Sequence, residues 1–128
     1  MATAKRALVS IVDDDESVRR ALKRLIQSVG LRAEVFASVD ELLYSGQLGN
    51  TACLILDVVM PGTGGLDFQR RLTSAKQHIP IVFITAHDDD HARQSALALG
   101  AAAFLRKPFS DEALLDVVRS VLDIGQGK

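Results

Sequence analysis

Five short apolar runs alternate with amphipathic stretches along the whole chain, and this alternation constrains the fold more than any other feature. The runs cover residues 7–12, 33–36, 53–56, 81–84 and 102–105. Four of them are almost continuously apolar, as expected of parallel strands that are covered on both faces. The run at 33–36 carries Glu34 and is typical of an edge strand. A strand followed by a helix, five times over, predicts a doubly wound α/β fold with a five-stranded parallel sheet and five helices.

The stretches between the runs carry apolar residues at helical spacing and several capping signals. Gly30 is placed to end the first helix, and Ser38 followed by Glu41 predicts a capping box at the start of the second. Ser110 or Asp111 is expected to cap the fifth. The apolar face of the fourth helix is expected to consist of Ala92, Ala96, Leu97 and Leu99.

Length and composition exclude several classes of protein. A chain of 128 residues fits one domain, which we expect over 1–123, with 124–128 as a tail or the start of a linker because it lacks periodicity. Fifteen basic and sixteen acidic residues leave no basic excess for binding nucleic acid. No apolar stretch approaches the roughly 18 residues of a membrane span. The single cysteine, Cys53, lies in an apolar run, which favours a buried thiol in a reducing, cytoplasmic location.

Polar residues interrupt the apolar runs at the same end each time. Asp13 and Asp14 follow the first run, Asp57 the third, Thr85 the fourth and Lys107 the fifth. Because the carboxyl ends of parallel strands share one edge of the sheet, these side chains should converge there, where open α/β sheets bind their ligands.

The predicted edge has an excess of negative charge. Three carboxylates repel one another in a partly buried site, and one ammonium cannot balance them. Either a proton is retained or a divalent cation binds, and an all-oxygen site suits Mg²⁺ better than Zn²⁺. A carboxylate beside such a metal, with an ammonium and a hydroxyl nearby, is equipped to attack phosphorus in a phosphoryl transfer.

At these residues the sequence resembles the receiver domain of two-component response regulators, over about residues 6–123. Four motifs in the right order carry the resemblance, namely 12–15 (Val-Asp-Asp-Asp), 56–62 (Leu-Asp-Val-Val-Met-Pro-Gly), 84–86 (Ile-Thr-Ala) and 107–109 (Lys-Pro-Phe). The run from 60 to 66 is most similar to nitrogen-fixation-type regulators that carry a helix-turn-helix output domain. The resemblance implies a flavodoxin-like fold with strand order 2-1-3-4-5.

The resemblance also implies residue roles. Asp57 matches the phosphoacceptor, which takes its phosphoryl group from a sensor histidine kinase in a Mg²⁺-dependent reaction. Asp13, Asp14 and Asp57 match the metal ligands, together with the backbone carbonyl of Val59. Lys107 matches the lysine that pairs with the phosphoryl group, and its bond to Pro108 is expected to be cis.

Two further positions match the switch of the family. Thr85 corresponds to the hydroxyl that moves to the new phosphoryl group, and Phe104 to the aromatic ring that turns inward in response. The implied result is a change in the face formed by the fourth helix, fifth strand and fifth helix, which then forms a homodimer or controls an output domain. DNA would be bound only through an output domain outside this chain, and the receiver would catalyse only its own phosphorylation and dephosphorylation.

Other interpretations stay open at this point. An aspartate-nucleophile phosphatase of the haloacid dehalogenase type uses similar residues, but it needs a second Asp where this chain has Val59. A pseudo-receiver that only mediates protein contacts, and a flavin-binding module of similar fold, are further alternatives. For single residues, Thr85 is also typical of a plain strand, Phe104 of core packing and 87–91 of a solvated loop. The basic face of the first helix, formed by Arg19, Arg20, Lys23 and Arg24, could contact a kinase or only solvent.

Overall fold

The computed structural model describes residues 7–58, 64–75, 79–86 and 90–125. Strands and helices alternate along them as the apolar pattern predicts, with one additional 3₁₀ turn, η1, between α2 and β3. In chain order the elements are β1 (Leu8–Val12), α1 (Glu16–Ser28), β2 (Arg32–Phe36), α2 (Val39–Ser45), η1 (Leu48–Asn50), β3 (Thr51–Asp57), α3 (Gly65–Ser74), β4 (Ile81–Thr85), α4 (Asp90–Ala98), β5 (Ala103–Arg106) and α5 (Asp111–Gly125).

The five strands form one parallel sheet in the order β2-β1-β3-β4-β5, which confirms the predicted fold and strand order. β2 is an edge strand, as its charged residue indicated. β5 is the other edge, and its apolar residues are only half-buried. Both faces of β5 are covered as expected, since Ala103 and Leu105 pack against the α1 and α5 side and Phe104 against the opposite side. The covering is less complete than in the central strands, because an edge strand has a neighbouring strand on one side only.

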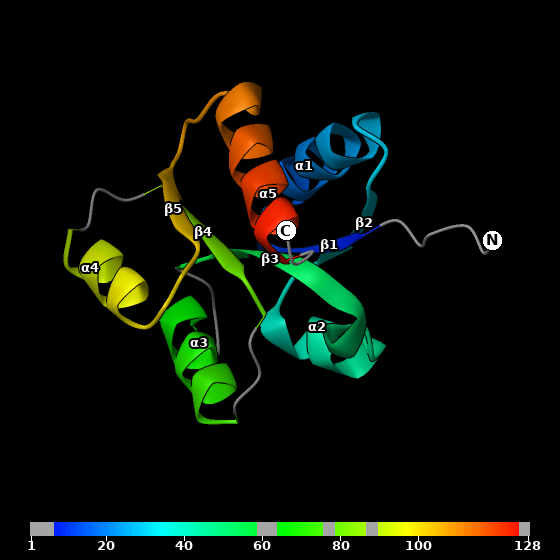
Figure 1. Cartoon of the computed structure of the whole chain (residues 1–128). Coiled ribbons are helices and arrows are strands. Elements are labelled where there is room, and N and C mark those ends of the chain that lie inside the picture. Colours follow the sequence, from blue (N-terminus) through cyan, green and yellow to red (C-terminus); the bar gives the residue numbers. More distant parts are fainter. Residues whose placement is uncertain (1–6, 59–63, 76–78, 87–89, 126–128) are drawn as a thin grey trace.

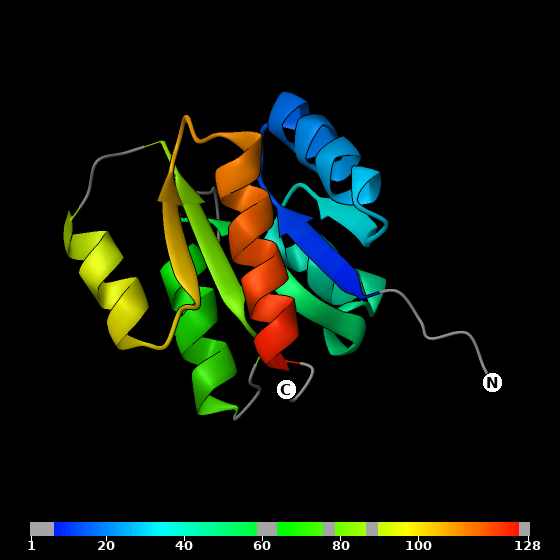
Figure 2. The same cartoon turned by 45° about the horizontal axis from the view of Figure 1, so that its top comes forward.

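Helices cover both faces of the sheet, with α1 and α5 on one face and α2, α3 and α4 on the other (Figures 1 and 2). Successive strand residues alternate between the two layers, so that Cys53 and Ile55 contact the α1 and α5 side while Leu54 and Leu56 contact the opposite side. The central strands are buried on both faces, which explains why their sequences are almost continuously apolar. None of the helices in these ranges combines the length and the apolar character needed to cross a bilayer.

The helix termini agree with most of the capping predictions. Gly30 has a positive φ of 86° just past the end of α1, as its position indicated. The hydroxyl of Ser38 accepts from the amide of Glu41 at 3.1 Å, but the Glu41 carboxylate accepts from the amide of Ala37 rather than that of Ser38. The second hydrogen bond of the capping box is therefore made to the amide one residue before the predicted one. For α5 the cap is Ser110, whose Oγ accepts from the amide of residue 113 at 3.0 Å.

α5 continues to Gly125, two residues beyond the predicted domain end at 123. Residues 126–128 of the expected tail lie outside the described ranges. The division into a domain and a tail therefore stays a prediction, although the last helix does not stop where the apolar pattern weakens.

α4 is the helix whose predicted face differs most from the observed one. Ala92 and Ala96 are buried, whereas Leu97 is 43% exposed, so the apolar contact surface of α4 is narrow and made of small side chains. Gln69 of α3 adds a polar contact, because its buried Nε2 donates to the carbonyl of Ala96 at 3.1 Å. Its Oε1 has no hydrogen-bond partner among the residues that the structure describes. α4 is consequently held by less apolar packing than the sequence indicated.

Candidate functional site: an acidic cluster at the carboxyl edge of the sheet

The structure brings the predicted polar residues to the carboxyl edge of four neighbouring strands. Asp13 directly follows β1, Asp57 ends β3, Thr85 ends β4 and Lys107 directly follows β5. Their strands are adjacent in the order β1-β3-β4-β5, and Asp57 is in register with Ile84, the residue before Thr85. The prediction that these residues lie together at one edge of the sheet is therefore confirmed.

Three carboxylates form a compact cluster there. Asp13, Asp14 and Asp57 each offer an oxygen atom, and these atoms lie within 4.8 Å of one another. Asp13 is fully buried and Asp57 is 7% exposed, whereas Asp14 is open to solvent. Oxygen ligands at this spacing, with one solvent-facing member that leaves room for water, fit Mg²⁺. Val59, the fourth predicted ligand, lies outside the described residues.

Lys107 is the basic partner of this cluster. Its Nζ lies 2.9 Å from Asp13 Oδ2 and 3.4 Å from Asp57 Oδ2. Burial lowers the pKa of Lys107, but the hydrogen bond to Asp13 and the negative charges of Asp57 and Asp13 outweigh it, so the net pKa is raised above its ordinary value. Lys107 thus stays charged, and a single ammonium still leaves the three carboxylates with excess negative charge. The peptide bond between Lys107 and Pro108 is cis, as the resemblance implies.

Thr85 is placed beside Lys107 by the backbone. It is 2% exposed, and its carbonyl accepts from the amide of Lys107 at 2.7 Å. Because this hydrogen bond joins the end of β4 to the first residue after β5, a shift of the backbone at Thr85 would also move the backbone of Lys107.

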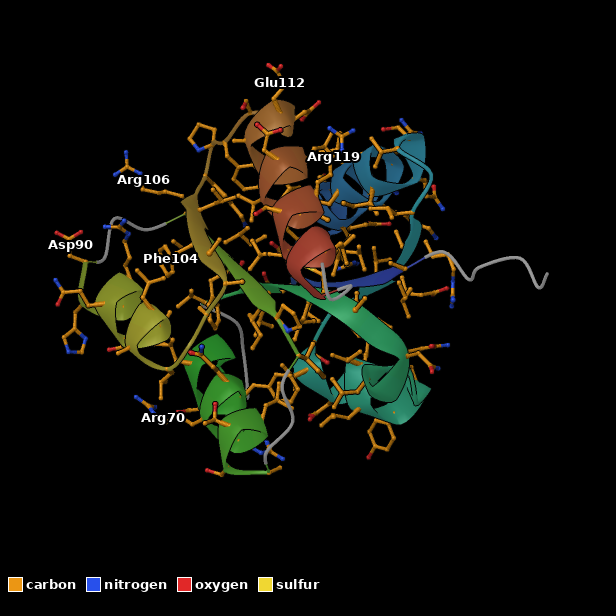
Figure 3. All side chains as sticks on the ribbon, in the orientation of Figure 1. Arg70, Asp90, Phe104, Arg106, Glu112 and Arg119 are labelled. Carbon is orange, nitrogen blue, oxygen red and sulfur yellow. The ribbon has the colours of Figure 1, made fainter. Side chains whose placement is uncertain are left out.

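Phe104 lies apart from the acidic cluster, within β5. Its ring centroid is 6.3 Å from that of Phe83, its register partner on β4, with the planes tilted by 41°. The ring is half-buried and packs against the core layer that contains Ala96 of α4 (Figure 3). Core packing, one of the two interpretations of Phe104, therefore describes its present contacts.

Sequence reasoning missed the role of Arg19. We placed this arginine on an outward basic face, yet its Nη1 donates to the backbone carbonyl of Asp13 at 2.8 Å. The signal was present in the sequence, because Arg19 lies within the first turns of the helix that directly follows the acidic pair.

Sequence reasoning also missed Gly65, the first residue of α3. A Cβ atom built there would lie 2.7 Å from the backbone oxygen of Asp57 and 3.1 Å from the ring of Phe83. The amide of Gly65 donates to the carbonyl of Val58 at 3.2 Å. Only glycine lets α3 begin this close to the chain that carries Asp57. Because other glycines lie next to Gly65 in the sequence, the sequence alone does not indicate which of them makes this close contact.

Comparisons with known proteins show the family to which this chain is similar. The model of the response regulator receiver domain family matches residues 9–119. Nodulation protein W of Bradyrhizobium diazoefficiens is 48% identical over 113 residues, which cover 88% of this chain and 50% of that protein. The transcriptional regulatory protein FixJ of Azorhizobium caulinodans is 37% identical over 114 residues, or 89% of this chain and 54% of that protein.

A solved structure agrees as well. The crystal structure of a response regulator receiver protein from Burkholderia phymatum is 48% identical with a TM-score of 0.80, and the match covers 92% of this chain and 96% of that one. The chain spans about half the length of the two curated relatives named above. With the family model matching most of its length and the acidic cluster and lysine in place, the chain belongs to the response regulator receiver domain family.

Proposed function

We propose that this receiver domain accepts a phosphoryl group on Asp57 from the phosphohistidine of a sensor kinase. The observation that carries the proposal is the cluster of Asp13, Asp14 and Asp57, in which Asp13 and Asp57 both contact the ammonium of Lys107. Membership of the family implies a cognate histidine kinase and a signalling role rather than an enzymatic one.

The chemistry follows from the positions of the charges. A carboxylate oxygen of Asp57 attacks phosphorus, the new P–O bond forms as the P–N bond to the histidine breaks, and the imidazole nitrogen leaves with the electron pair. Asp13, Asp14 and Asp57 would hold Mg²⁺, which supplies positive charge for the phosphoryl oxygens. Lys107 already reaches Asp57 at 3.4 Å, and it would pair with a phosphoryl oxygen once the carboxylate has become an acyl phosphate.

The switch that follows would pass through Thr85 and Phe104. Phosphorylation adds negative charge and acceptor oxygens at the edge where Thr85 ends β4. The Thr85 hydroxyl would move toward these oxygens, and the Phe104 ring would turn into the space that this movement opens. α4 buries only two small side chains, Ala92 and Ala96, and accepts a hydrogen bond from Gln69, so it would be the element on this face that a small bias shifts.

The outcome of the switch would be read on the face formed by α4, β5 and α5. We propose that this face forms a homodimer or controls an output domain, through which alone DNA would be bound. The similarity to a transcriptional regulatory protein over about half of that protein's length supports an output of this kind.

Intact-protein mass spectrometry with acetyl phosphate tests the chemistry. In the presence of Mg²⁺ the wild-type protein should gain the mass of one phosphoryl group, and Asp57→Asn should gain none. The gain should disappear with a chelator, and size-exclusion chromatography of the same samples reports a change in assembly. Wild-type protein that stayed unmodified under these conditions would contradict the proposal and favour a pseudo-receiver.

The phosphatase alternative makes a different prediction in the same samples. Steady release of inorganic phosphate from small phosphomonoesters, over many turnovers, would favour it. The chain has Val59 where such enzymes need a second aspartate, so we expect labelling that stops after one phosphoryl group per molecule.

A further inference from the structure

We propose that Arg19 is a positioning residue for the Mg²⁺ site, acting through the peptide group between Asp13 and Asp14. The inference rests on the proposed function, because it concerns the metal that phosphoryl transfer would use. It assigns to one arginine of the basic face of α1 a task directed inward, at the acidic cluster.

Every polar group of Asp13 is engaged. Its amide donates to the carbonyl of Phe36 at 3.1 Å, its Oδ1 accepts from the amide of Asp15 at 2.9 Å and its Oδ2 accepts from Lys107 at 2.9 Å. The remaining group is the carbonyl, which accepts from Arg19 Nη1 at 2.8 Å. Arg19 thus completes the set of bonds that orient Asp13.

The situation of Asp14 is the opposite. It is exposed, and among the described residues no hydrogen bond or ion pair holds its carboxylate. Its position depends on the backbone that leads to it. The peptide group between Asp13 and Asp14 is planar, so the direction of the Asp13 carbonyl sets the direction in which the chain enters Asp14. By holding this carbonyl, Arg19 keeps the Asp14 carboxylate within 4.8 Å of Asp13 and Asp57.

Arg20 provides a contrast on the same helix. It carries the same charge one residue later, but its side chain is 69% exposed and pairs with Glu16 on the surface at 2.9 Å. Arg19 is half-buried, and its own amide donates to the carbonyl of Asp15 at 3.0 Å, which joins the first turn of α1 to the acidic loop. A comparison of variants at Arg19 and Arg20 therefore distinguishes an effect of side-chain position on the metal site from an effect of charge.

A positioning role of Arg19 and a simple effect of its charge predict changes of opposite sign in the affinity for Mg²⁺. Removing a positive charge near a cation site strengthens the binding of the cation, whereas releasing a group that orients the ligands weakens it. If Arg19 acts through its charge alone, Arg19→Gln binds Mg²⁺ more tightly. If it acts by positioning, Arg19→Gln binds Mg²⁺ less tightly, by about tenfold, in the range for partners that orient metal ligands.

The test is a Mg²⁺ titration followed by the amide chemical shifts of residues 13–15, with folding checked by circular dichroism. We expect Arg19→Gln, which is too short to reach the carbonyl, to bind about tenfold more weakly than the wild type, and Arg20→Gln to stay within about twofold. Arg19→Lys keeps a positive charge and a donor on a slightly shorter side chain, so it should regain part of the affinity. Arg19→Met, which keeps the packing of the aliphatic stem without a donor, gives the same comparison if the glutamine variant does not fold.

The outcomes separate this inference from the proposed function. Wild-type protein that binds Mg²⁺ and is labelled by acetyl phosphate, together with an Arg19→Gln variant that binds as tightly or more tightly, would overturn the assignment of Arg19 alone. Equal weakening in Arg19→Gln and Arg20→Gln would also overturn it, because position would then play no part. A wild-type protein that binds no Mg²⁺ would overturn both.

Discussion

Replacing Asp57 by asparagine should make the protein more stable in the absence of divalent cations, even though it removes the proposed phosphoacceptor. The side chain keeps its size and an acceptor oxygen, but it loses its negative charge. Asp57 is 7% exposed and stands next to two further carboxylates. The sign of the effect depends on whether these two carboxylates repel Asp57 more than Lys107 attracts it.

The distances decide this sign. At an effective dielectric constant of about 20, two unit charges no more than 4.8 Å apart repel by at least about 3.5 kcal/mol, so Asp13 and Asp14 together cost about 7 kcal/mol before solvent screening. Lys107, 3.4 Å from Asp57, contributes about 5 kcal/mol of attraction. Solvent screening of exposed Asp14 reduces the repulsion, and the desolvation of buried Asp57 adds to the cost. We expect Asp57→Asn to gain about 2 kcal/mol in the free energy of unfolding, or roughly 6 to 8 °C in melting temperature.

Thermal and urea unfolding with a chelator, and again with saturating Mg²⁺, measure this effect. Mg²⁺ should raise the melting temperature of the wild-type protein because it binds only the folded site and relieves the repulsion. The variant has lost one ligand, so its gain should be smaller and the difference between the two proteins should shrink or reverse.

Asp67→Asn is a matched control, since Asp67 is a surface carboxylate of α3, 71% exposed and paired with Arg70. Its stability should change by less than about 0.5 kcal/mol. An Asp57→Asn variant that melts at or below the wild-type temperature in the chelator would refute the charge argument.

Three further changes test other parts of the structure. Lys107→Met should lower the free energy of unfolding by about 3 kcal/mol in the chelator. Because the folded-state pKa of Lys107 is raised, its contribution is present below about pH 10.5, and the difference from wild type should shrink as the pH rises beyond it. Gly65→Ala should lower the free energy of unfolding by at least about 2 kcal/mol and reduce labelling by acetyl phosphate, since its Cβ would lie 2.7 Å from the backbone oxygen of Asp57. Gly49→Ala is the control and should be nearly neutral, because a Cβ there has nothing within 4 Å. Burial raises the pKa of Cys53 from 9.0 to about 12, so the contribution of the buried thiol to stability is lost as the pH rises from 9 toward 12. The urea midpoint of Cys53→Ala should therefore fall less steeply than that of the wild type over this range. A thiol reagent should react with Cys53 only on unfolding.

Several features follow from the sequence because they are local. The alternation of apolar runs with helical spacing records the burial of each segment, and it predicted all five strands and all five helices. The placement of Asp13, Asp57, Thr85 and Lys107 at one edge follows from a rule of connectivity, because successive parallel strands all end at the same side of the sheet. The strand order came from the family motifs, since periodicity does not distinguish one neighbour from another.

The tertiary structure decided which side chains reach across from one element to another. A one-dimensional pattern placed Arg19 on a polar face, but the course of α1 beside β1 brings its guanidinium to the carbonyl of Asp13. The same pattern counted Leu97 as buried, although α4 lies at an open side of the fold and leaves it 43% exposed. Gly65 became significant only when α3 was packed against the chain after Asp57. Sequence periodicity reports how much of a residue is covered, whereas these contacts depend on the angles and distances at which separate elements pack, and only the folded chain determines those.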